Sequence, residues 1–299
     1  MRPRGWGAVA LLGACAASGH TPFDGDAALG YVREQVAFGP RIPNTDGHRR
    51  AGDWIQAHLA RAADSVEVQV FTHVTEAGDT LRLRNFLGRF RPELPERILL
   101  LAHWDTRPTA DQSPNLGDQR RPVPGANDGA SGVAVLLGVA DVLAVAPPSR
   151  GVDLLFVDGE DYGTFTGPDG GIGPDVLLGS RHFAASLPPD RFPLYAVLLD
   201  MVGDADLRIS QEGYSVARAP EVVTRVWDAA RDLGYGDVFV PGVRYTITDD
   251  HIPLLDRGIR AIDVIDYEYP AWHTVDDTPD NVSARSLKIV GDVVVALVR

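Results

Sequence analysis

Short apolar runs followed by charged residues constrain the fold of this chain more than any other feature. The runs occupy residues 98–102, 152–157, 195–199 and 259–265, and each adjoins acidic residues or leads towards a histidine. Runs of this length, rich in leucine and β-branched residues, are typical of buried strands in an α/β sheet. Ligands of such sheets bind outside the carboxyl ends of the strands, so the polar residues are expected to gather there.

The polar residues beside these runs predict a zinc enzyme. Carboxylates and imidazoles are suitable zinc ligands, no cysteine lies nearby, and a catalytic zinc keeps one coordination position open for water or substrate. Each residue alone also has an ordinary structural explanation, such as a hydrogen-bonded histidine at a strand end. The recurrence of such residues at one predicted edge of the sheet favours a metal site over these separate explanations. The candidate donors are His103, Asp128, Asp161, Asp200 and His273.

Asp128 lies in the segment 124–132, where small residues flank it and an apolar helix is predicted directly afterwards. Small residues let the backbone approach a metal closely, and the amino terminus of a helix stabilises a carboxylate. The alternative is that Asp128 only caps its helix.

Two neighbouring carboxylates, Glu160 and Asp161, follow the second apolar run. Successive side chains at a strand end face opposite ways, so one can bind metal while the other faces a substrate. A buried glutamate beside a metal and other carboxylates has a tunable pKa, which suits a general acid/base and assigns that role to Glu160. The alternative interpretation is a solvated acidic turn.

The remainder of the chain predicts one large α/β domain or two small ones. Its 299 residues, 44% of them hydrophobic, can build a sizeable core, and the formal net charge of −13 argues against a nucleic-acid partner. Strands alternating with helices favour a doubly wound, largely parallel sheet. Helices are predicted at 47–63, 130–144, 221–233 and 283–298, further strands at 66–74 and 80–90, and candidate rim or lid loops at 106–124 and 163–174.

Residues 1–22 predict an export signal that is not part of the fold. A short basic region precedes an apolar stretch at 5–14, which is too short to span a bilayer as a helix. Residues 12–15, which end at Cys15, resemble the lipobox of bacterial lipoprotein signal peptides, in which the cysteine becomes the lipidated first residue. The alternative is an ordinary signal peptide cleaved nearby, with Cys15 incidental. Both interpretations predict an exported protein, either periplasmic or anchored at the periplasmic face of a bacterial membrane.

Five motifs follow one another along the chain. They are His103-Trp104-Asp105-Thr106, residues 125–132, Asp158-Gly159-Glu160-Asp161, Leu199-Asp200-Met201 and residues 272–277. Taken in order, they resemble the motifs of the zinc-dependent exopeptidases of the bacterial aminopeptidase type. Within that superfamily the chain is most similar to the glutaminyl cyclases of animal type and their bacterial relatives. The resemblance implies a single α/β/α sandwich domain, residues 23–299, with a central mixed, mostly parallel twisted sheet.

The resemblance also implies a role for each residue of the motifs. Many relatives carry two adjacent glutamates where this chain has Glu160 followed by Asp161. Because aspartate has the shorter reach, the metal or the strand end must lie slightly closer. The implied roles are Asp128, Asp161 and His273 as zinc ligands, Glu160 as acid/base, Asp200 and Asp249 as catalytic hydrogen-bonding partners, and Trp272 as a substrate-binding wall.

Three features favour a cyclase over an aminopeptidase. Trp272 precedes the implied ligand where aminopeptidases more often carry tyrosine, and the acidic pair 249–250 and the segment 103–108 also resemble cyclases. The implied reaction converts the N-terminal glutamine of peptides or proteins to pyroglutamate with release of ammonia. We expect a monomer that contacts the membrane only through a lipid anchor.

Two alternatives remain open. A two-zinc metallo-aminopeptidase would use His103 and Asp200 to complete a second metal site, and would activate a bridging water with Glu160. An exported lipoprotein without catalytic activity is less favoured, because this chain retains every ligand and the acid/base.

Overall fold

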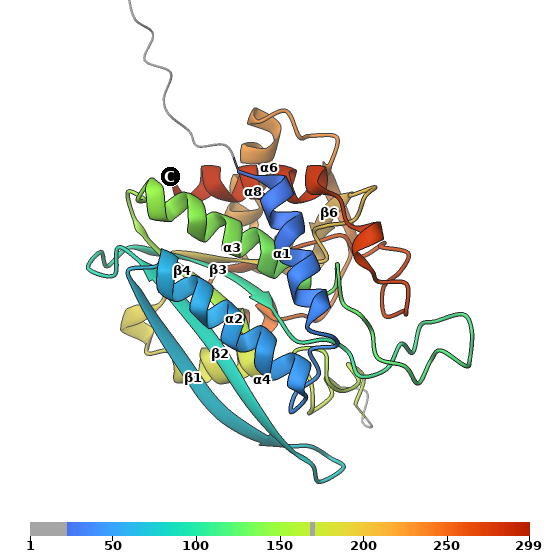
Figure 1. Ribbon diagram of the computed structural model, residues 1–299. Coiled ribbons are helices and arrows are strands. Elements are labelled where there is room, and N and C mark those ends of the chain that lie inside the picture. The colour runs from blue at the N-terminus through green and yellow to red at the C-terminus, as the bar shows by residue number, and fades with distance from the viewer. Residues whose placement is uncertain (1–22, 168–170) are drawn as a thin grey trace, which may run out of the picture.

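A mixed six-stranded sheet forms the centre of the protein, in the strand order β1-β2-β4-β3-β5-β8 (Figure 1). The computed structural model describes residues 23–167 and 171–299. Strands β3, β4, β5 and β8 are mutually parallel, whereas β2 pairs antiparallel with both β1 and β4. The strands are β1 (Ser65–Val74), β2 (Thr80–Phe90), β3 (Arg97–His103), β4 (Gly151–Val157), β5 (Tyr195–Asp200) and β8 (Ala261–Ile265).

Helices cover both faces of this sheet, so the predicted α/β/α sandwich with a mixed, mostly parallel sheet is confirmed. One face carries most of the core and packs against α1, α2, α3, α6 and α8, and the other face packs against α4 and α7. The helices are α1 (Gly25–Ala37), α2 (Asp46–Ala62), α3 (Ala130–Val145), α4 (Leu178–Ser186), α5 (Gly213–Arg218), α6 (Pro220–Asp232), α7 (His251–Asp256) and α8 (Ala284–Val298).

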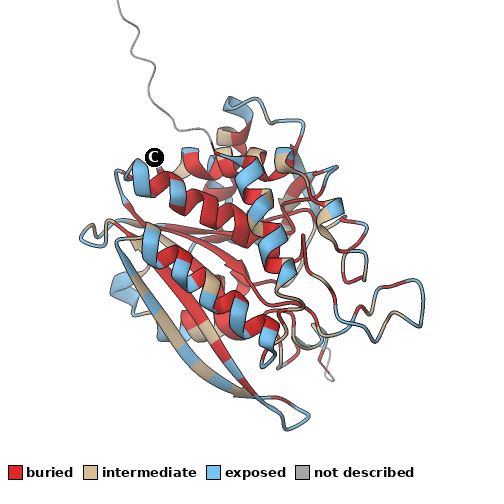
Figure 2. Cartoon of the chain, in the orientation of Figure 1, coloured by how far each residue is buried: buried red, intermediate tan, exposed pale blue. Residues whose placement is uncertain are grey.

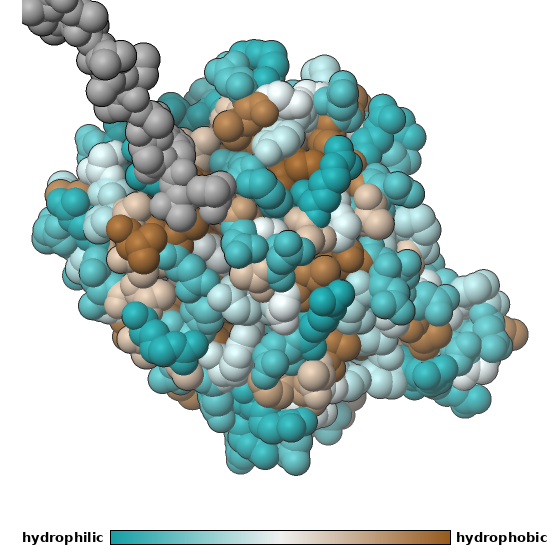
Figure 3. Space-filling model, turned by 45° about the horizontal axis from the view of Figure 1, so that its top comes forward, coloured by the Kyte–Doolittle hydropathy of each residue, from teal (hydrophilic) through white to brown (hydrophobic). Residues whose placement is uncertain are grey.

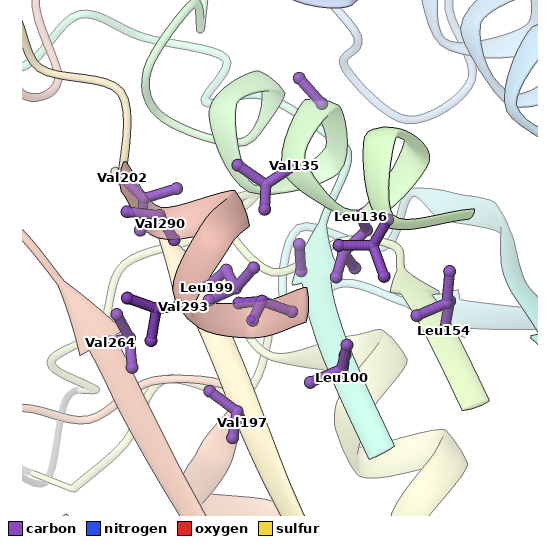
Figure 4. Packing of buried hydrophobic residues seen from close by; sticks show 14 of the residues in the cluster. Leu100, Val135, Leu136, Leu154, Val197, Leu199, Val202, Val264, Val290 and Val293 are labelled. Carbon is purple, nitrogen blue, oxygen red and sulfur yellow. The ribbon is translucent and has the colours of Figure 1, made fainter. Parts of the chain in front are cut away.

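The larger core lies between the parallel strands and the helices α3 and α8. Figure 4 shows Leu100 and Val197 of the sheet on the side that faces Val135 of α3 and Val293 of α8. Helix α3 is buried along most of its length, because α1 and α8 pack on it as well as the sheet (Figure 2). Burial on several sides explains its almost wholly apolar sequence, and it fixes the segment that precedes α3 against the sheet.

The connections of the sheet reverse at β3. Helix α3, on one face, links β3 to β4, whereas α4, on the other face, links β4 to β5 on the far side of β3. Ligands of open α/β sheets bind at such reversal points, outside the carboxyl ends of the strands. The register sets His103 of β3 opposite Val157 of β4, just before the acidic segment.

The strands and helices predicted from sequence are all present, within a few residues of their predicted ends. The sequence interpretation missed α1, the short helices α4, α5 and α7, and a second sheet in which β6 (Ile209–Glu212) pairs with β7 (Phe239–Tyr245). Helices of six to nine residues contain too few turns for a periodic pattern to be recognised.

The surface agrees with the acidic composition. On the face that Figure 3 shows, hydrophilic side chains predominate and apolar ones form separate small groups. Among the described residues, no helix combines the length and the apolar character needed to cross a membrane. The predicted signal segment, including Cys15, lies outside the described residues.

Candidate active site

The carboxyl ends of the parallel strands bring the five predicted donors together. His103 ends β3, Asp200 ends β5, Asp161 follows β4, and Asp128 lies just before α3. His273 comes from the loop after β8. All five are at most 8% exposed, and their ligand atoms form two groups that share Asp128. We call Asp128, Asp161 and His273 the first triad, and His103, Asp128 and Asp200 the second triad.

The first triad offers one nitrogen and two carboxylate oxygens to a common point. His273 Nε2 lies 3.5 Å from Asp128 Oδ2 and 3.4 Å from Asp161 Oδ2. Asp161 Oδ2 is buried and has no hydrogen-bond partner. A buried carboxylate oxygen is costly unless a donor or a cation satisfies it. Two carboxylates and one imidazole with a position left over are the donor set of a catalytic zinc, so these residues fit that metal.

Arg107 and Asp111 hold two members of the first triad in place. The Arg107 guanidinium donates to Asp161 Oδ1 at 2.6 Å and to both oxygens of Asp111 at 3.0 and 2.8 Å. Asp111 in turn lies 3.5 Å from His273 Nδ1. Burial would raise the pKa of Asp111, but hydrogen bonds from His273 and Arg107 hold it below its ordinary value. A carboxylate on the second ring nitrogen orients a histidine ligand and increases its basicity.

Backbone donors fix the two acidic segments. Asp277 accepts the amide hydrogens of Asn127 and Asp128 at 2.8 and 3.1 Å, and Asp105 accepts those of Glu160 and Asp161 at 3.0 and 3.2 Å. These bonds tie each acidic segment to a buried carboxylate from another part of the chain.

Gly129 lets the segment before α3 approach β3 closely. Its φ of +87° lies in the left-handed region, and a Cβ there would meet the Asp105 carbonyl oxygen at 2.7 Å. Gly129 also occupies the N-cap position of α3, and no side chain caps that helix. The interpretation of Asp128 as only a helix cap is therefore wrong.

In the second triad, the histidine contacts both carboxylates directly. His103 Nε2 lies 3.1 Å from Asp128 Oδ1 and 3.2 Å from Asp200 Oδ1. Burial opposes the charged ring, but the charge of Glu160 and hydrogen bonds to neighbouring carboxylates raise the pKa of His103 well above its ordinary value. His103 Nε2 thus contacts one oxygen of each carboxylate, whereas its Nδ1 has no hydrogen-bond partner.

Glu160 lies beside His103 of the second triad and precedes Asp161 of the first in the chain. Its Oε2 is 3.8 Å from His103 Nδ1, and its side chain lines the same cavity as Asp128, Asp200 and His273. Glu160 is 5% exposed and Asp161 is 1% exposed, so the alternative of a solvated acidic turn is wrong. Burial, together with the nearby Asp161, Asp249 and Asp250, raises the pKa of Glu160 well above its ordinary value. A carboxyl group perturbed in this way is suited to taking up and releasing a proton.

Asp249 lines the same cavity, beside other buried acidic residues. Burial, reinforced by the charge of Asp200, raises the pKa of Asp249 to about 7. Its neighbour Asp250 is hydrogen-bonded to Ser180. Asp263, a residue of β8, is also buried, and neither of its oxygens has a hydrogen-bond partner. The sequence does not reveal which carboxylates lie near Asp263, because it is a single aspartate within an apolar strand.

A cavity of about 810 Å³ opens over the first triad. Trp272 forms part of its wall and stacks on His273 with ring centres 4.1 Å apart. Residues of both predicted rim loops also line the cavity, among them Arg107 and Thr164, so their prediction as rims is confirmed. Pockets that hold whole small molecules measure about 300–1,000 Å³, so this cavity has room for more than one side chain.

Arg41 also supports the site and was missed. Its buried guanidinium donates to the carbonyl oxygens of Trp104, Pro124 and Gly125, and so joins the end of β3 to the segment before Asp128. Burial lowers the pKa of Arg41 to about 10. Arg107 lay in a motif recognised in the sequence but had no assigned role, because its partner Asp161 is 54 residues away.

An α/β/α sandwich with a two-carboxylate, one-histidine metal site at the reversal point of its sheet defines the class of the zinc-dependent exopeptidases. Residues 85–298, well over half of the chain, match the model of "Peptidase family M28". The chain belongs to this family, which confirms the resemblance seen in its motifs.

Solved structures of similar proteins cover nearly the whole chain. A Zn-dependent exopeptidase from Parabacteroides distasonis has a TM-score of 0.87 at 38% identity, covering 92% of this chain and 98% of its own. A glutaminyl cyclase from Bacteroides thetaiotaomicron, bound to N-acetylhistamine, has a TM-score of 0.86 at 38% identity, covering 93% of this chain and 98% of its own. Among curated relatives, the glutaminyl-peptide cyclotransferase of Bos taurus is 25% identical, covering 83% of this chain and 74% of its own length.

Proposed function

We propose that this protein is a zinc-dependent glutaminyl-peptide cyclotransferase, an acyltransferase that converts N-terminal glutamine to pyroglutamate and releases ammonia. Glutaminyl cyclases among its solved and curated relatives support this activity. The observation that carries the proposal is the buried oxygen Oδ2 of Asp161 in the first triad, which has no hydrogen-bond partner in the protein and is suited to a cation. One metal site beside one proton carrier is sufficient for cyclisation.

A zinc ion held by Asp128, Asp161 and His273 would supply Lewis-acid polarisation of the γ-amide carbonyl. These residues would also position that carbonyl at the inner end of the cavity, beside Glu160. Trp272, stacked on His273, forms an apolar wall for the methylene groups of the glutamine side chain.

Glu160 carries the proton in the proposed reaction. The substrate's own α-amine attacks the γ-carbon, forms the new C–N bond and gives a proton to the Glu160 carboxylate. Glu160 returns that proton to the amide nitrogen, the original C–N bond breaks, and ammonia leaves. Because both reacting groups belong to one substrate residue, orientation supplies much of the rate enhancement. Asp200 and Asp249, which line the cavity beside Glu160, hydrogen-bond the amine and the carboxyl group during this transfer.

A two-zinc aminopeptidase is the second candidate, and one observation favours it. The ligand atoms of His103, Asp128 and Asp200 lie close enough to hold a second ion. That ion would replace the direct contacts of His103 Nε2 with Asp128 Oδ1 and Asp200 Oδ1.

Mass spectrometry of reacted peptides separates the two activities. The zinc-loaded protein should shift a peptide with N-terminal glutamine by the mass of one ammonia and leave its length unchanged. It should release little free leucine from a leucyl peptide, because internal attack needs no activated water. Removal of the first residue from varied peptides, with two zinc ions per chain, would instead establish the aminopeptidase.

We also propose that the protein is exported as a lipoprotein whose partners are peptides or proteins with N-terminal glutamine. The basic residues, the apolar stretch and Cys15 in the first 22 residues support export. The native protein should partition into detergent, and Cys15→Ser should accumulate as a precursor or become soluble. Mature protein that begins downstream of Cys15 without an acyl chain contradicts the lipid anchor.

A further inference from the structure

Two residues of the sequence motifs have no part in the site described above. Trp104 follows His103 at the end of β3, and Asp158 comes directly after β4, at the start of the acidic segment that contains Glu160. Both Trp104 and Asp158 are fully buried. A buried carboxylate is costly unless donors satisfy it, so the groups that donate to Asp158 indicate which parts of the chain it joins.

His48, in the first turn of α2, is the side-chain partner of Asp158. Its Nε2 lies 2.8 Å from Asp158 Oδ1 and 3.0 Å from Oδ2, and its buried ring stacks on Trp104 with ring centres 4.3 Å apart. Because an ionised carboxylate only accepts hydrogen bonds, Nε2 is the donor. The amide of Arg84 also donates to Asp158 Oδ2, at 2.7 Å. The pair of His48 and Asp158 therefore ties α2 to the carboxyl end of β4.

The position of Glu160 depends on this segment, because no side chain holds its carboxyl group. Among the described residues that group accepts no hydrogen bond, and its Oε2 lies 3.8 Å from His103 Nδ1. Asp161, by contrast, accepts a hydrogen bond from Arg107 at 2.6 Å. The backbone therefore places Glu160, whereas Asp161 has a side-chain anchor of its own.

Gly159 separates Asp158 from Glu160 and lets the backbone turn between them. Its φ of +71° lies in the left-handed region. Glycine adds little stiffness to a turn, so contacts on both sides of it must fix the conformation. On one side, Asp105 accepts the amide hydrogen of Glu160 at 3.0 Å. On the other side, His48 holds the side chain of Asp158.

We propose that His48 is a positioning residue for the proton carrier. It holds the Asp158 carboxylate, and through the turn at Gly159 it sets where the Glu160 carboxyl group lies in the cavity. The inference rests on the proposed cyclisation of N-terminal glutamine and adds a residue of α2 to it. His48 does not line the cavity, so its effect on turnover has to pass through Asp158.

Two polar substitutions of His48 test this role. Glutamine carries an amide donor about as far from the backbone as Nε2, whereas asparagine is one methylene shorter. His48→Asn should lower kcat about 10- to 100-fold, because displacing a reacting group by about 1 Å can cost about 100-fold. KM should change by less than about 2-fold, since uniform binding is not removed. His48→Gln should keep kcat within about 3-fold of the unaltered protein. Ammonia release from a peptide with N-terminal glutamine is measured per zinc-loaded chain.

His58 is the matched control on the same helix. It is buried as well, and its Nε2 lies 2.9 Å from Asp141 Oδ1, but Asp141 belongs to α3 and neither residue lines the cavity. His58→Asn should lower the melting temperature, as His48→Asn does, and leave kcat of the folded, zinc-loaded protein unchanged. A double variant of His48→Asn and Asp158→Asn should be no slower than the slower single variant, because both break one link.

The outcomes separate this inference from the proposed function. Absence of ammonia release by the unaltered zinc-loaded protein overturns the cyclase, and this inference with it. Where the unaltered protein turns over, an unchanged kcat in His48→Asn overturns only the role of His48. The same follows if His48→Gln is no faster than His48→Asn, if His58→Asn loses kcat equally, or if the losses multiply in the double variant. Loss of zinc with a normal kcat in the loaded fraction also overturns it, because the pair then holds Asp161 and not Glu160.

Discussion

The two triads share Asp128 and have nearly the same composition, yet their surroundings differ. In the first, Arg107 takes one oxygen of Asp161 and leaves the other without a partner. In the second, a histidine at the end of a central strand hydrogen-bonds both carboxylates itself. Two groups with similar residues and spacing can therefore differ in metal binding, because the hydrogen-bond partners of each carboxylate decide which oxygen needs an ion.

The largest expected effect tests whether Glu160 acts beside the triads as a proton carrier and not as a ligand. Glu160→Gln should lower kcat about 10²- to 10⁴-fold, the usual contribution of a positioned acid/base, while zinc stays bound. Zinc content and ammonia release are measured on the same preparation. Glu96→Gln, an exposed acid outside the cavity, is the control and should behave as the unaltered protein. Substantial turnover by Glu160→Gln would remove this residue from the mechanism.

The next prediction separates the triads by their metal content. His273→Ala should weaken zinc binding by more than about 100-fold, because even loss of a group that only supports a ligand costs about 10- to 100-fold. His103→Gln should leave one zinc per chain, since the proposed single zinc site does not use its ring. Metal analysis after dialysis against a weak chelator measures both. A fall from two zinc ions to one in His103→Gln would show that the second triad binds metal.

Much of this arrangement could be predicted from the sequence, because its signals are local. The apolar runs at β3, β4, β5 and β8 reveal buried strands, and in a parallel sheet the residues after them necessarily meet at one edge. Small residues around Asp128 likewise indicate close backbone approach, which the positive φ of Gly129 bears out.

The remaining features depend on contacts between distant segments. The pairing of Arg107 with Asp161, and the carboxylates from several elements that surround His103, have no local pattern. Helix α5 is six residues long and too short for its periodicity to be read. The sequence therefore identified the candidate ligands but not the side chains that hold them in place.

Without zinc, the stability that Asp249 and His273 contribute should fall as the pH rises, whereas the stabilisation by bound zinc should grow. Burial raises the pKa of Asp249 to about 7, so without zinc the folded state binds more protons than the unfolded state from about pH 4 to 7. Stability due to this group is then lost as pH rises through that window. Burial opposes the charged form of His273, but the charge of Asp161 and hydrogen bonds to Asp111 and Asp161 raise the pKa of His273 to about 9. The contribution of His273 to stability is therefore lost as the pH rises from about 6.5 to 9.

Zinc needs deprotonated ligands, so its stabilisation grows over the same range. The difference in melting temperature between zinc-loaded and chelator-treated protein should widen from pH 5 to pH 9. Each kcal/mol corresponds to about 2–4 °C in a domain of roughly this size. Thermal unfolding at matched ionic strength measures the difference, and a gap that stays constant or narrows with pH contradicts the assignment of the first triad.

The smallest expected effect concerns Trp272, whose ring stacks on His273 of the first triad. Its ring stacks on His273 and lines the cavity, so Trp272→Ala should raise KM about 3- to 10-fold by removing an aromatic contact with the substrate. Zinc content should not change, because Arg107 and Asp111 still hold the triad. Trp272→Phe should retain most of the affinity, and Trp54→Phe, on α2 outside the cavity, is the control. If Trp272→Ala instead loses zinc while KM for the remaining loaded fraction stays the same, the ring serves to orient His273 and is not a substrate wall. In that case Trp272 would support the ligand His273 of the first triad. The histidine of the second triad has no such support, because His103 is positioned by its contacts with Asp200 and Asp128.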